Sequence, residues 1–168
     1  MPTRVDVLPM KCTLLDPRYN SGFLIGMSAE EVIVAQSGKF VILNTSTGYG
    51  EIADDAEAPI AGWVDLEAQT TSATAGGTKA HCIDDLNAKF IIPLAYDNST
   101  WTVNWAETFM NETCDIDVTA NNRQCANITS SSEDDIVAVG GKACTSATAN
   151  DGFVIAKLYA ARALNECA

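Results

Sequence analysis

The sequence predicts an all-β fold: a small sandwich or barrel of short antiparallel strands with an extended N-terminal arm. Two observations predict it. The 168 residues are 47% hydrophobic and 19% charged, with many Thr, Ser, Ala and Gly, which is typical of β-rich chains and unlike a Lys/Glu-rich helical protein. The apolar runs are short and are separated by small-residue or acidic loops, as in sandwiches and barrels. The length suits one domain, or one domain with an arm.

The arm is predicted over residues 1–20. Pro2, Pro9 and Pro17 lie in this stretch, and proline disfavours helix both at its own position and at the residue before it. An extended segment of this kind needs another surface to lie on.

The β-rich body is predicted over residues 21–168. It begins with the short apolar runs 23–26 and 31–35. The turn signal Ser37-Gly38 then precedes a third run, 39–43, and this arrangement predicts a hairpin between the second and third runs.

The middle of the chain predicts further strands in two sub-sheets. The apolar run 60–66 follows an acidic loop, and the segment 69–80 is nearly all Thr, Ser, Ala and Gly, which favours a link between two sub-sheets. Beyond it, residues 88–95 predict a strand with Pro93 at an edge or an end. The alternation in 100–105 predicts a strand with its tryptophans on one face.

The C-terminal part repeats the pattern of paired runs. Residues 135–141 and 153–158 are apolar runs separated by a small-residue loop, which predicts two more strands. The alanine-rich tail, 159–168, has the composition of a short helical turn.

The charge and composition exclude several classes of protein. The formal net charge is −12, with only ten Lys and Arg, so neither nucleic acid nor an anionic membrane surface is an expected partner. No apolar run is long enough to span a bilayer. The N-terminus lacks the apolar segment of a secretory signal, so we expect reduced thiols and unglycosylated sequons.

The six cysteines do not predict a disulfide framework. Strand alternation places Cys114 on an apolar face with Ile116, whereas Cys125 falls on a polar face with Asn127. We therefore expect two separate thiols, with Cys114 acting as a small buried hydrophobe.

Residues that could carry chemistry are sparse. His81 is the only histidine, and Cys82 beside it would point to the opposite face of a strand. The acidic pairs 54–55, 84–85 and 134–135 are interpreted as turn residues, with calcium binding left as the alternative. We expect no cofactor, no metal site and no catalytic residue. The three tryptophans are expected to be buried rather than to form a sugar-binding platform.

The runs 38–43, 59–64, 135–141 and 153–155 together resemble the small β-rich decoration, or cement, proteins of tailed-bacteriophage capsids. The resemblance covers about a third of the chain. It implies a structural virion protein that forms a homotrimer on the capsid surface and stabilises contacts between major capsid proteins. It also implies assembly in the host cytoplasm and no enzymatic activity.

The arm is the candidate capsid-binding element. Arg4, Lys11 and Arg18 are three of the ten basic residues, so the body that follows is more acidic than the chain as a whole. We expect these three residues and Tyr19 to contact the capsid while the acidic loops face solvent. The alternative is a β-sandwich module that binds a receptor or a carbohydrate, which exposed tryptophans would favour.

Overall fold

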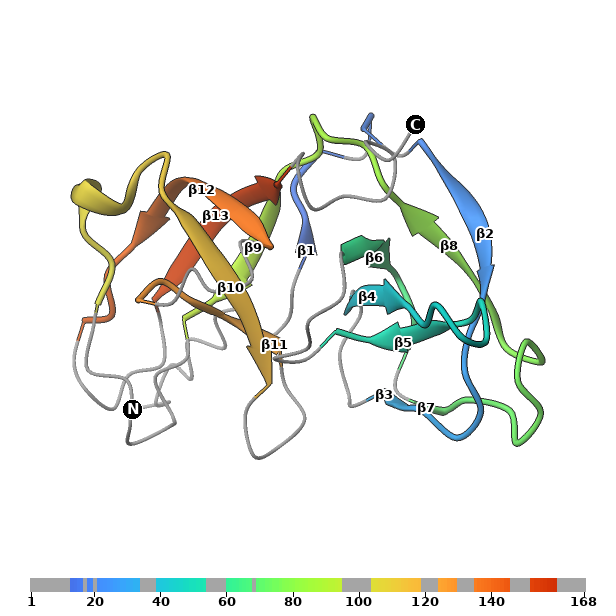
Figure 1. Ribbon diagram of the computed structural model, residues 1–168. Coiled ribbons are helices and arrows are strands. Elements are labelled where there is room, and N and C mark those ends of the chain that lie inside the picture. The colour runs from blue at the N-terminus through green and yellow to red at the C-terminus, as the bar shows by residue number, and fades with distance from the viewer. Residues whose placement is uncertain are drawn as a thin grey trace, which may run out of the picture.

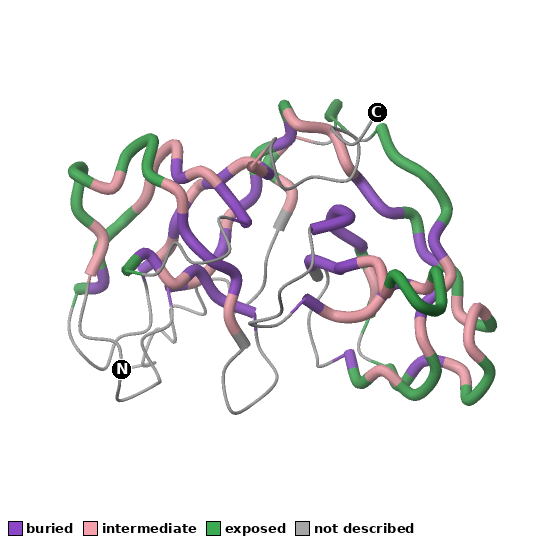
Figure 2. Tube along the Cα trace, viewed as in Figure 1, coloured by how far each residue is buried: buried purple, intermediate pink, exposed green. Residues whose placement is uncertain are grey.

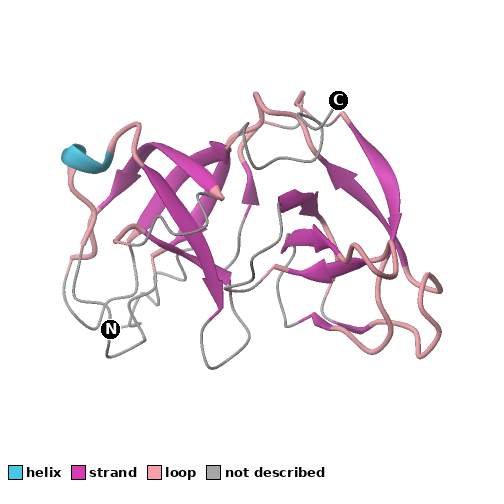
Figure 3. Ribbon diagram, viewed as in Figure 1, coloured by secondary structure: helices cyan, strands magenta, loops and turns pink. Residues whose placement is uncertain are grey.

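The computed structural model describes residues 13–16, 18–19, 21–33, 39–53, 60–67, 69–94, 104–118, 124–129, 135–145 and 152–159. Strands dominate this part of the chain, with a single 3₁₀ turn (Figure 3), and the all-β prediction is confirmed. The strands are β1 (Thr13–Leu14), β2 (Gly22–Gly26), β3 (Val32–Ile33), β4 (Lys39–Leu43), β5 (Gly50–Ile52), β6 (Ile60–Val64), β7 (Gln69–Thr70), β8 (Lys79–Ile83), β9 (Phe90–Pro93), β10 (Thr113–Val118), β11 (Gln124–Asn127), β12 (Ile136–Lys142) and β13 (Phe153–Leu158), and the 3₁₀ turn η1 is Glu107–Phe109.

The strands form two large sheets that lie next to each other (Figure 1). The six-stranded sheet has the order β1-β9-β13-β12-β10-β11, and the five-stranded sheet has the order β2-β8-β6-β4-β5. The short strands β3 and β7 form a separate pair. Each large sheet curls toward closure, because parallel bridges connect Met27 with Gly50 and Leu94 with Ala126.

Two chain segments that run side by side connect the large sheets. Residues 15–21 lead from β1 to β2, and residues 84–89 lead from β8 back to β9. The N–H of Leu15 donates to the carbonyl of Lys89 at 2.8 Å, and the N–H of Asp84 donates to the carbonyl of Ser21 at 3.3 Å. The crossing to the six-stranded sheet therefore lies at 84–89, whereas the expected link at 69–80 holds β7 and the start of β8.

The predicted hairpin between the runs 31–35 and 39–43 is wrong. β3 pairs with β7, while β4 pairs with β5 and β6. The turn that does form a hairpin with β4 is the loop to β5, where Asn44 Oδ1 accepts from the N–H groups of Ser46 and Thr47. An asparagine that bonds to the backbone two and three residues on favours a turn at that point.

The predicted strands at 23–26, 60–66, 88–95, 135–141 and 153–158 are confirmed, each over at least half of its length. β12 and β13 pair antiparallel over most of their length, and Pro93 is the last residue of β9. The predicted strand at 100–105 does not extend over Asn104 and Trp105, which are irregular, and its first residues lie outside the described ranges. The predicted helical turn at 159–168 also lies outside them, apart from Tyr159.

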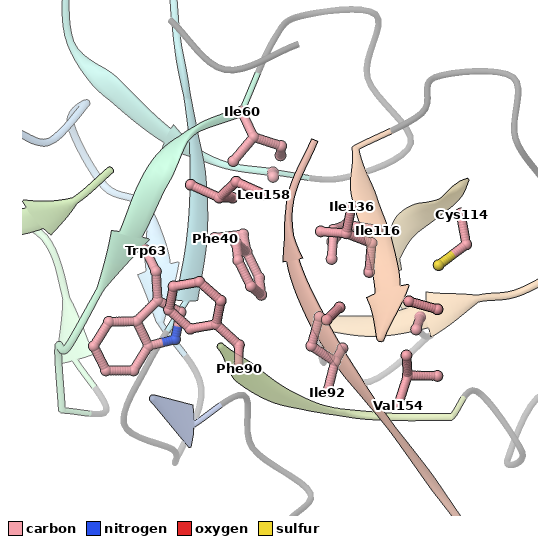
Figure 4. Close-up of a cluster of buried hydrophobic side chains, with 14 of the residues drawn as sticks. Phe40, Ile60, Trp63, Phe90, Ile92, Cys114, Ile116, Ile136, Val154 and Leu158 are labelled. Carbon is pink, nitrogen blue, oxygen red and sulfur yellow. The ribbon is translucent and has the colours of Figure 1, made fainter. Parts of the chain in front are cut away.

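The larger hydrophobic core spans both sheets. Phe90 of β9 packs against Phe40 of β4 with ring centroids 5.2 Å apart in an edge-to-face arrangement, and against Trp63 of β6 at 5.7 Å. Figure 4 shows these three rings beside the aliphatic side chains of the six-stranded sheet, including Ile92 and Ile116. Aromatic pairs at these distances add to the stabilisation from burial alone, so the two sheets share one core.

The strands β4 and β6 are buried on both faces. In β4, Phe40 faces the shared core, whereas Val41 faces a second cluster inside the five-stranded sheet. In β6, Ile60 and Trp63 both face the shared core. Residues three apart share a face here because a β-bulge shifts the register between β4 and β6. All five residues of β6 are consequently buried.

One buried side chain connects the two sheets by hydrogen bonds. Gln124 of β11 is 3% exposed. Its Nε2 donates to the carbonyls of Phe40 and Ala53, both at 2.7 Å, and its Oε1 accepts from the N–H of Phe40 at 2.7 Å. Buried amides need such partners, so Gln124 fixes the six-stranded sheet against the edge of β4.

Candidate contact surface

Exposed apolar side chains gather in one short segment. Of the six large hydrophobic residues that are exposed in the described part of the chain, four lie between positions 15 and 24. They are Leu15, Tyr19, Phe23 and Leu24, with exposed fractions of 41%, 40%, 38% and 67%. Contiguous exposed apolar surface on a soluble domain marks interaction sites more often than isolated exposed residues do. We call residues 15–24 the contact segment.

The contact segment is held in place by the crossing at 84–89. Besides the two backbone hydrogen bonds given above, Ser21 Oγ donates to Asp85 Oδ2 at 3.1 Å. Asp85 is itself fixed, because its Oδ1 accepts from the N–H of Asn87 at 2.9 Å. Hydrogen bonds near both ends of the segment thus anchor it to the same connection, which favours a defined arrangement of its exposed side chains.

A charged turn lies inside the contact segment. The Arg18 guanidinium forms a two-pronged ion pair with Asp16, with Nε 3.0 Å from Oδ1 and Nη2 2.6 Å from Oδ2. The N–H of Tyr19 donates to the carbonyl of Asp16 and closes the turn. Hydrogen bonds from Arg18 lower the pKa of Asp16 to about 2. This ion pair sets the direction of Arg18, whose side chain is 83% exposed.

The ion pair predicts a measurable titration. Replacing Arg18 with glutamine should raise the pKa of Asp16 from about 2 toward its ordinary value of 3.8, because the main stabilisation of the carboxylate comes from the guanidinium. In the wild type, the ion pair's contribution to the stability of the turn should be present near neutral pH. It should be lost as the pH falls below 3.8 and through about 2, where Asp16 takes up its proton. Carboxyl-carbon chemical shifts during an acid titration would measure it, and an unchanged midpoint in Arg18→Gln would contradict the prediction.

The structure places two of the four predicted capsid-contact residues at this surface. Arg18 and Tyr19 are both exposed in the contact segment, whereas Arg4 and Lys11 lie outside the described residues. Leu15, Phe23 and Leu24 were not predicted as contact residues, because Leu15 lies in the predicted arm without a charge or aromatic ring and the other two lie in the apolar run 23–26, which was predicted only as a strand. No local signal could have found the last two, because an apolar run such as Phe23-Leu24-Ile25 occurs both in core strands and in edge strands.

The residues around the single histidine do not converge. His81 is exposed and Cys82 is fully buried, as expected for neighbours on one strand. Burial raises the pKa of the Cys82 thiol to about 12, so this cysteine is neutral at physiological pH and is not a nucleophile.

The buried thiol predicts a loss of stability at high pH. Because the pKa of Cys82 is about 12 in the folded protein and 9.0 without burial, the unfolded chain loses its proton first as the pH rises. The free energy of unfolding should therefore fall between pH 9 and 12 by about 1.4 kcal/mol per pH unit from this group. Urea titrations at several pH values should show a smaller slope for Cys82→Ala. Equal slopes would contradict the prediction.

The acidic pairs are turn or core residues where they are described. Asp85 accepts from Asn87 in a turn, while Asp135 is 2% exposed and accepts from the N–H of Ile116 at 3.0 Å. Residues 54, 55 and 134 lie outside the described ranges. Among the residues that the structure describes, no group of three His, Cys, Asp or Glu side chains is arranged to hold a metal ion.

Four cysteines and two tryptophans lie in the described ranges, whereas Trp101, which was also expected to be buried, lies outside them. Cys114 and Cys125 are buried thiols and do not bond to each other, as expected. The opposite faces predicted for the two cysteines are confirmed, because Cys125 pairs with Asp117 and lies outside the core cluster that contains Cys114. Cys125 is nevertheless 2% exposed, and its Sγ donates to the carbonyl of Asp117. Trp63 is buried, and the half-buried Trp105 packs against Phe109 with ring centroids 6.3 Å apart.

The described elements and surface define an all-β protein with two sheets around a shared core and an exposed apolar segment. Comparison of the chain with protein-family models, with curated proteins and with solved structures gave no match. In the described ranges, no helix has both the length and the apolar character needed to cross a membrane.

Proposed function

We propose that this chain is a decoration, or cement, protein that binds the outside of a tailed-phage capsid and stabilises contacts between major capsid proteins. The observation that carries the proposal is the contact segment, where four exposed apolar side chains lie within ten residues that are anchored to the crossing at 84–89. A protein that acts through a surface needs such a preorganised patch, because ordering side chains on binding costs free energy.

The chemistry of the contact segment suits a protein partner. Tyrosine and arginine are enriched among the residues that contribute most to protein interfaces. Arg18 and Tyr19 lie side by side, flanked by the apolar Leu15 and Phe23. The net charge of −12 disfavours nucleic acid as the partner. In this proposal the protein is a homotrimer at the virion surface, assembled in the host cytoplasm, and has no catalytic role.

The two tryptophans in the described ranges, Trp63 and Trp105, do not favour the alternative of a carbohydrate-binding module. Trp63 is 5% exposed, and the ring of Trp105 lies over the backbone of Gly141, where an added Cβ would come within 2.4 Å of it. Sugar-binding platforms need an exposed aromatic face. We therefore retain capsid decoration as the proposed function.

Cosedimentation with purified capsids of the virus that encodes the chain would test the proposal. We expect the wild type to pellet with capsids, and Tyr19→Asp to bind at least about tenfold more weakly, since buried aromatic residues dominate interface energy. The matched control is Met110→Asp, because Met110 is 44% exposed and lies beside η1, away from the contact segment (Figure 1). It should bind like the wild type.

Two outcomes would overturn the proposal. Wild-type protein that stays in the supernatant at saturating capsid concentration would exclude capsid binding. Equal losses for Tyr19→Asp and Met110→Asp would exclude the contact segment as the binding site. Light scattering on the purified chain would test the trimer separately.

A further inference from the structure

Strand β2 has one edge that pairs with β8 and one that faces outward. The N–H of Asp84 donates to the carbonyl of Ser21, and the N–H of Met27 donates to the carbonyl of Thr78. These bonds fix the alternation of the antiparallel ladder, in which every second residue exchanges both backbone bonds with its neighbour. Ser21, Phe23, Ile25 and Met27 therefore direct their N–H and C=O groups toward β8, whereas Gly22 and Leu24 direct theirs outward.

The open part of this edge is short. At its C-terminal end, β5 covers the edge, since Met27 bridges to Gly50 and the N–H of Ser28 donates to the carbonyl of Gly50 at 2.8 Å. From Gly22 to Leu24 the strand is exposed. β2 forms the outer margin of the five-stranded sheet in Figure 1, and Figure 2 shows the same stretch in green.

The β2 edge differs from the other outer strands of the two large sheets, where β11 is bridged by Leu94 and the other two have charges in or beside them. β1 is only two residues long and is followed by Asp16 and Arg18, and β5 contains Glu51. By contrast, residues 19–29 contain no charged side chain. Natural sheets protect their edges with charges or short strands, so an uncharged and apolar edge indicates a surface that pairs.

We propose that the β2 edge binds the β2 edge of a second copy of this chain, antiparallel, about a two-fold axis at Phe23. In this register Gly22 lies opposite Leu24 of the second copy, and each such pair exchanges two backbone hydrogen bonds. Phe23 lies opposite Phe23 of the second copy at a position without these bonds, where side chains approach most closely. The exposed apolar surface of Phe23 and Leu24 is thereby covered, which leaves Leu15, Arg18 and Tyr19 of the contact segment exposed for a capsid.

The observations favour a second copy as the occupant. A two-fold interface requires one surface to complement itself, and the outward donors and acceptors of Gly22 and Leu24 match each other in this register. Two copies that each carry a net charge of −12 repel each other. The repulsion is weakest where the facing surfaces carry no charge, and the uncharged stretch 19–29 is such a surface.

The first test removes an outward N–H. Leu24→Pro removes the N–H that faces the second copy and leaves the hydrogen bonds to β8 in place. Proline is tolerated on an edge strand where its N–H would face solvent, so the variant should fold. Sedimentation at about 100 µM, a concentration that detects weak association, should show an even-numbered assembly for the wild type and at least a tenfold weaker association for Leu24→Pro. Leu24→Val, which keeps the N–H, should associate like the wild type.

The second test reads the register by disulfide formation. Cys82 lies opposite Phe23 in β8, so the variants are made in a Cys82→Ala background. Phe23→Cys should form a crosslinked dimer under mild oxidation at least about tenfold faster than Leu24→Cys, since only the former faces itself across the axis at a bridgeable distance. If exposure alone set the crosslinking rate, Leu24→Cys would react faster, because Leu24 is 67% exposed and Phe23 is 38% exposed in the wild type.

The outcomes separate this inference from the proposed function. Any one of three results would overturn the self-pairing: a monomeric wild type, association that Leu24→Pro leaves unchanged, or faster crosslinking through Leu24→Cys. If a strand of another protein occupies the edge instead, the purified wild type should show no association through β2. None of these measurements involves capsids. A trimer that also pairs through β2 would sediment as a hexamer, whereas a trimer unaffected by Leu24→Pro would contradict the inference and leave capsid decoration standing.

Discussion

Replacing Gln124 with leucine is expected to lower the free energy of unfolding by about 3 kcal/mol, because two buried backbone groups lose their partners at about 1–3 kcal/mol each. The groups are the N–H of Phe40 and the carbonyl of Ala53. The carbonyl of Phe40 keeps a second donor, the N–H of Ala53 at 3.0 Å. Leucine has nearly the volume of glutamine, so the loss reports hydrogen bonds rather than a cavity.

Urea denaturation of the purified variant would measure this effect. The matched control is Gln69→Leu, since Gln69 is also in a strand but is exposed, and it should change the free energy of unfolding by less than about 0.5 kcal/mol. If Gln124→Leu were as stable as the control, the amide would not be what holds β11 against β4. A separate unfolding transition for each sheet in Gln124→Leu would support its role in coupling them.

The parts of the fold that the sequence predicted are those with strong local patterns. The apolar runs that became β4, β6, β12 and β13 consist mainly of β-branched and aromatic residues, which favour strands wherever they can be buried. β4 and β6 are also free of charged residues in their interiors, as expected for strands covered on both faces. The structure pairs them with each other, which the sequence did not predict.

The parts that the sequence did not predict depend on contacts between distant residues. Nothing near β3 in the chain indicates that it pairs with β7 rather than with β4. The crossing at 84–89 is short and carries no glycine or proline, so it lacked the composition of a linker that made 69–80 attractive. Gln124 was also missed, because a single polar residue in a strand gives no sign that its partners lie 71 and 84 positions away.

The candidate contact surface was predicted in part. Proline spacing and basic residues led to the prediction of contact residues within 1–20, and of these Arg18 and Tyr19 are exposed in the structure. The apolar members were missed because a run such as 23–26 has the same sequence pattern in a core strand and in an exposed edge strand. Only the sheet order, in which β2 is the outermost strand beside β8, distinguishes the two cases.

Replacing Gly62 with alanine is expected to cost at least about 3 kcal/mol, or to prevent folding, because the site has no room for a methyl group. A Cβ at this position would lie 2.5 Å from the carbonyl oxygen of Ile83 and 2.6 Å from the Sγ of Cys82. The carbonyl belongs to the backbone of β8, the neighbouring strand, so it can move only if the ladder between β6 and β8 opens. Gly62 also has a φ of 155° at the β-bulge, a conformation that alanine disfavours.

The control for this effect is Gly140→Ala, also in a strand beside an irregular register. A Cβ there would meet only the side chain of Ile155, at 3.7 Å, which is ordinary van der Waals contact. Its free energy of unfolding should stay within about 1 kcal/mol of the wild type, since alanine restricts the unfolded chain more than glycine does. Thermal unfolding of both variants would measure the difference. Combining Gly62→Ala with Cys82→Ala should not restore stability, because the contact with the Ile83 carbonyl remains; full rescue would show that the thiol alone excludes the methyl group.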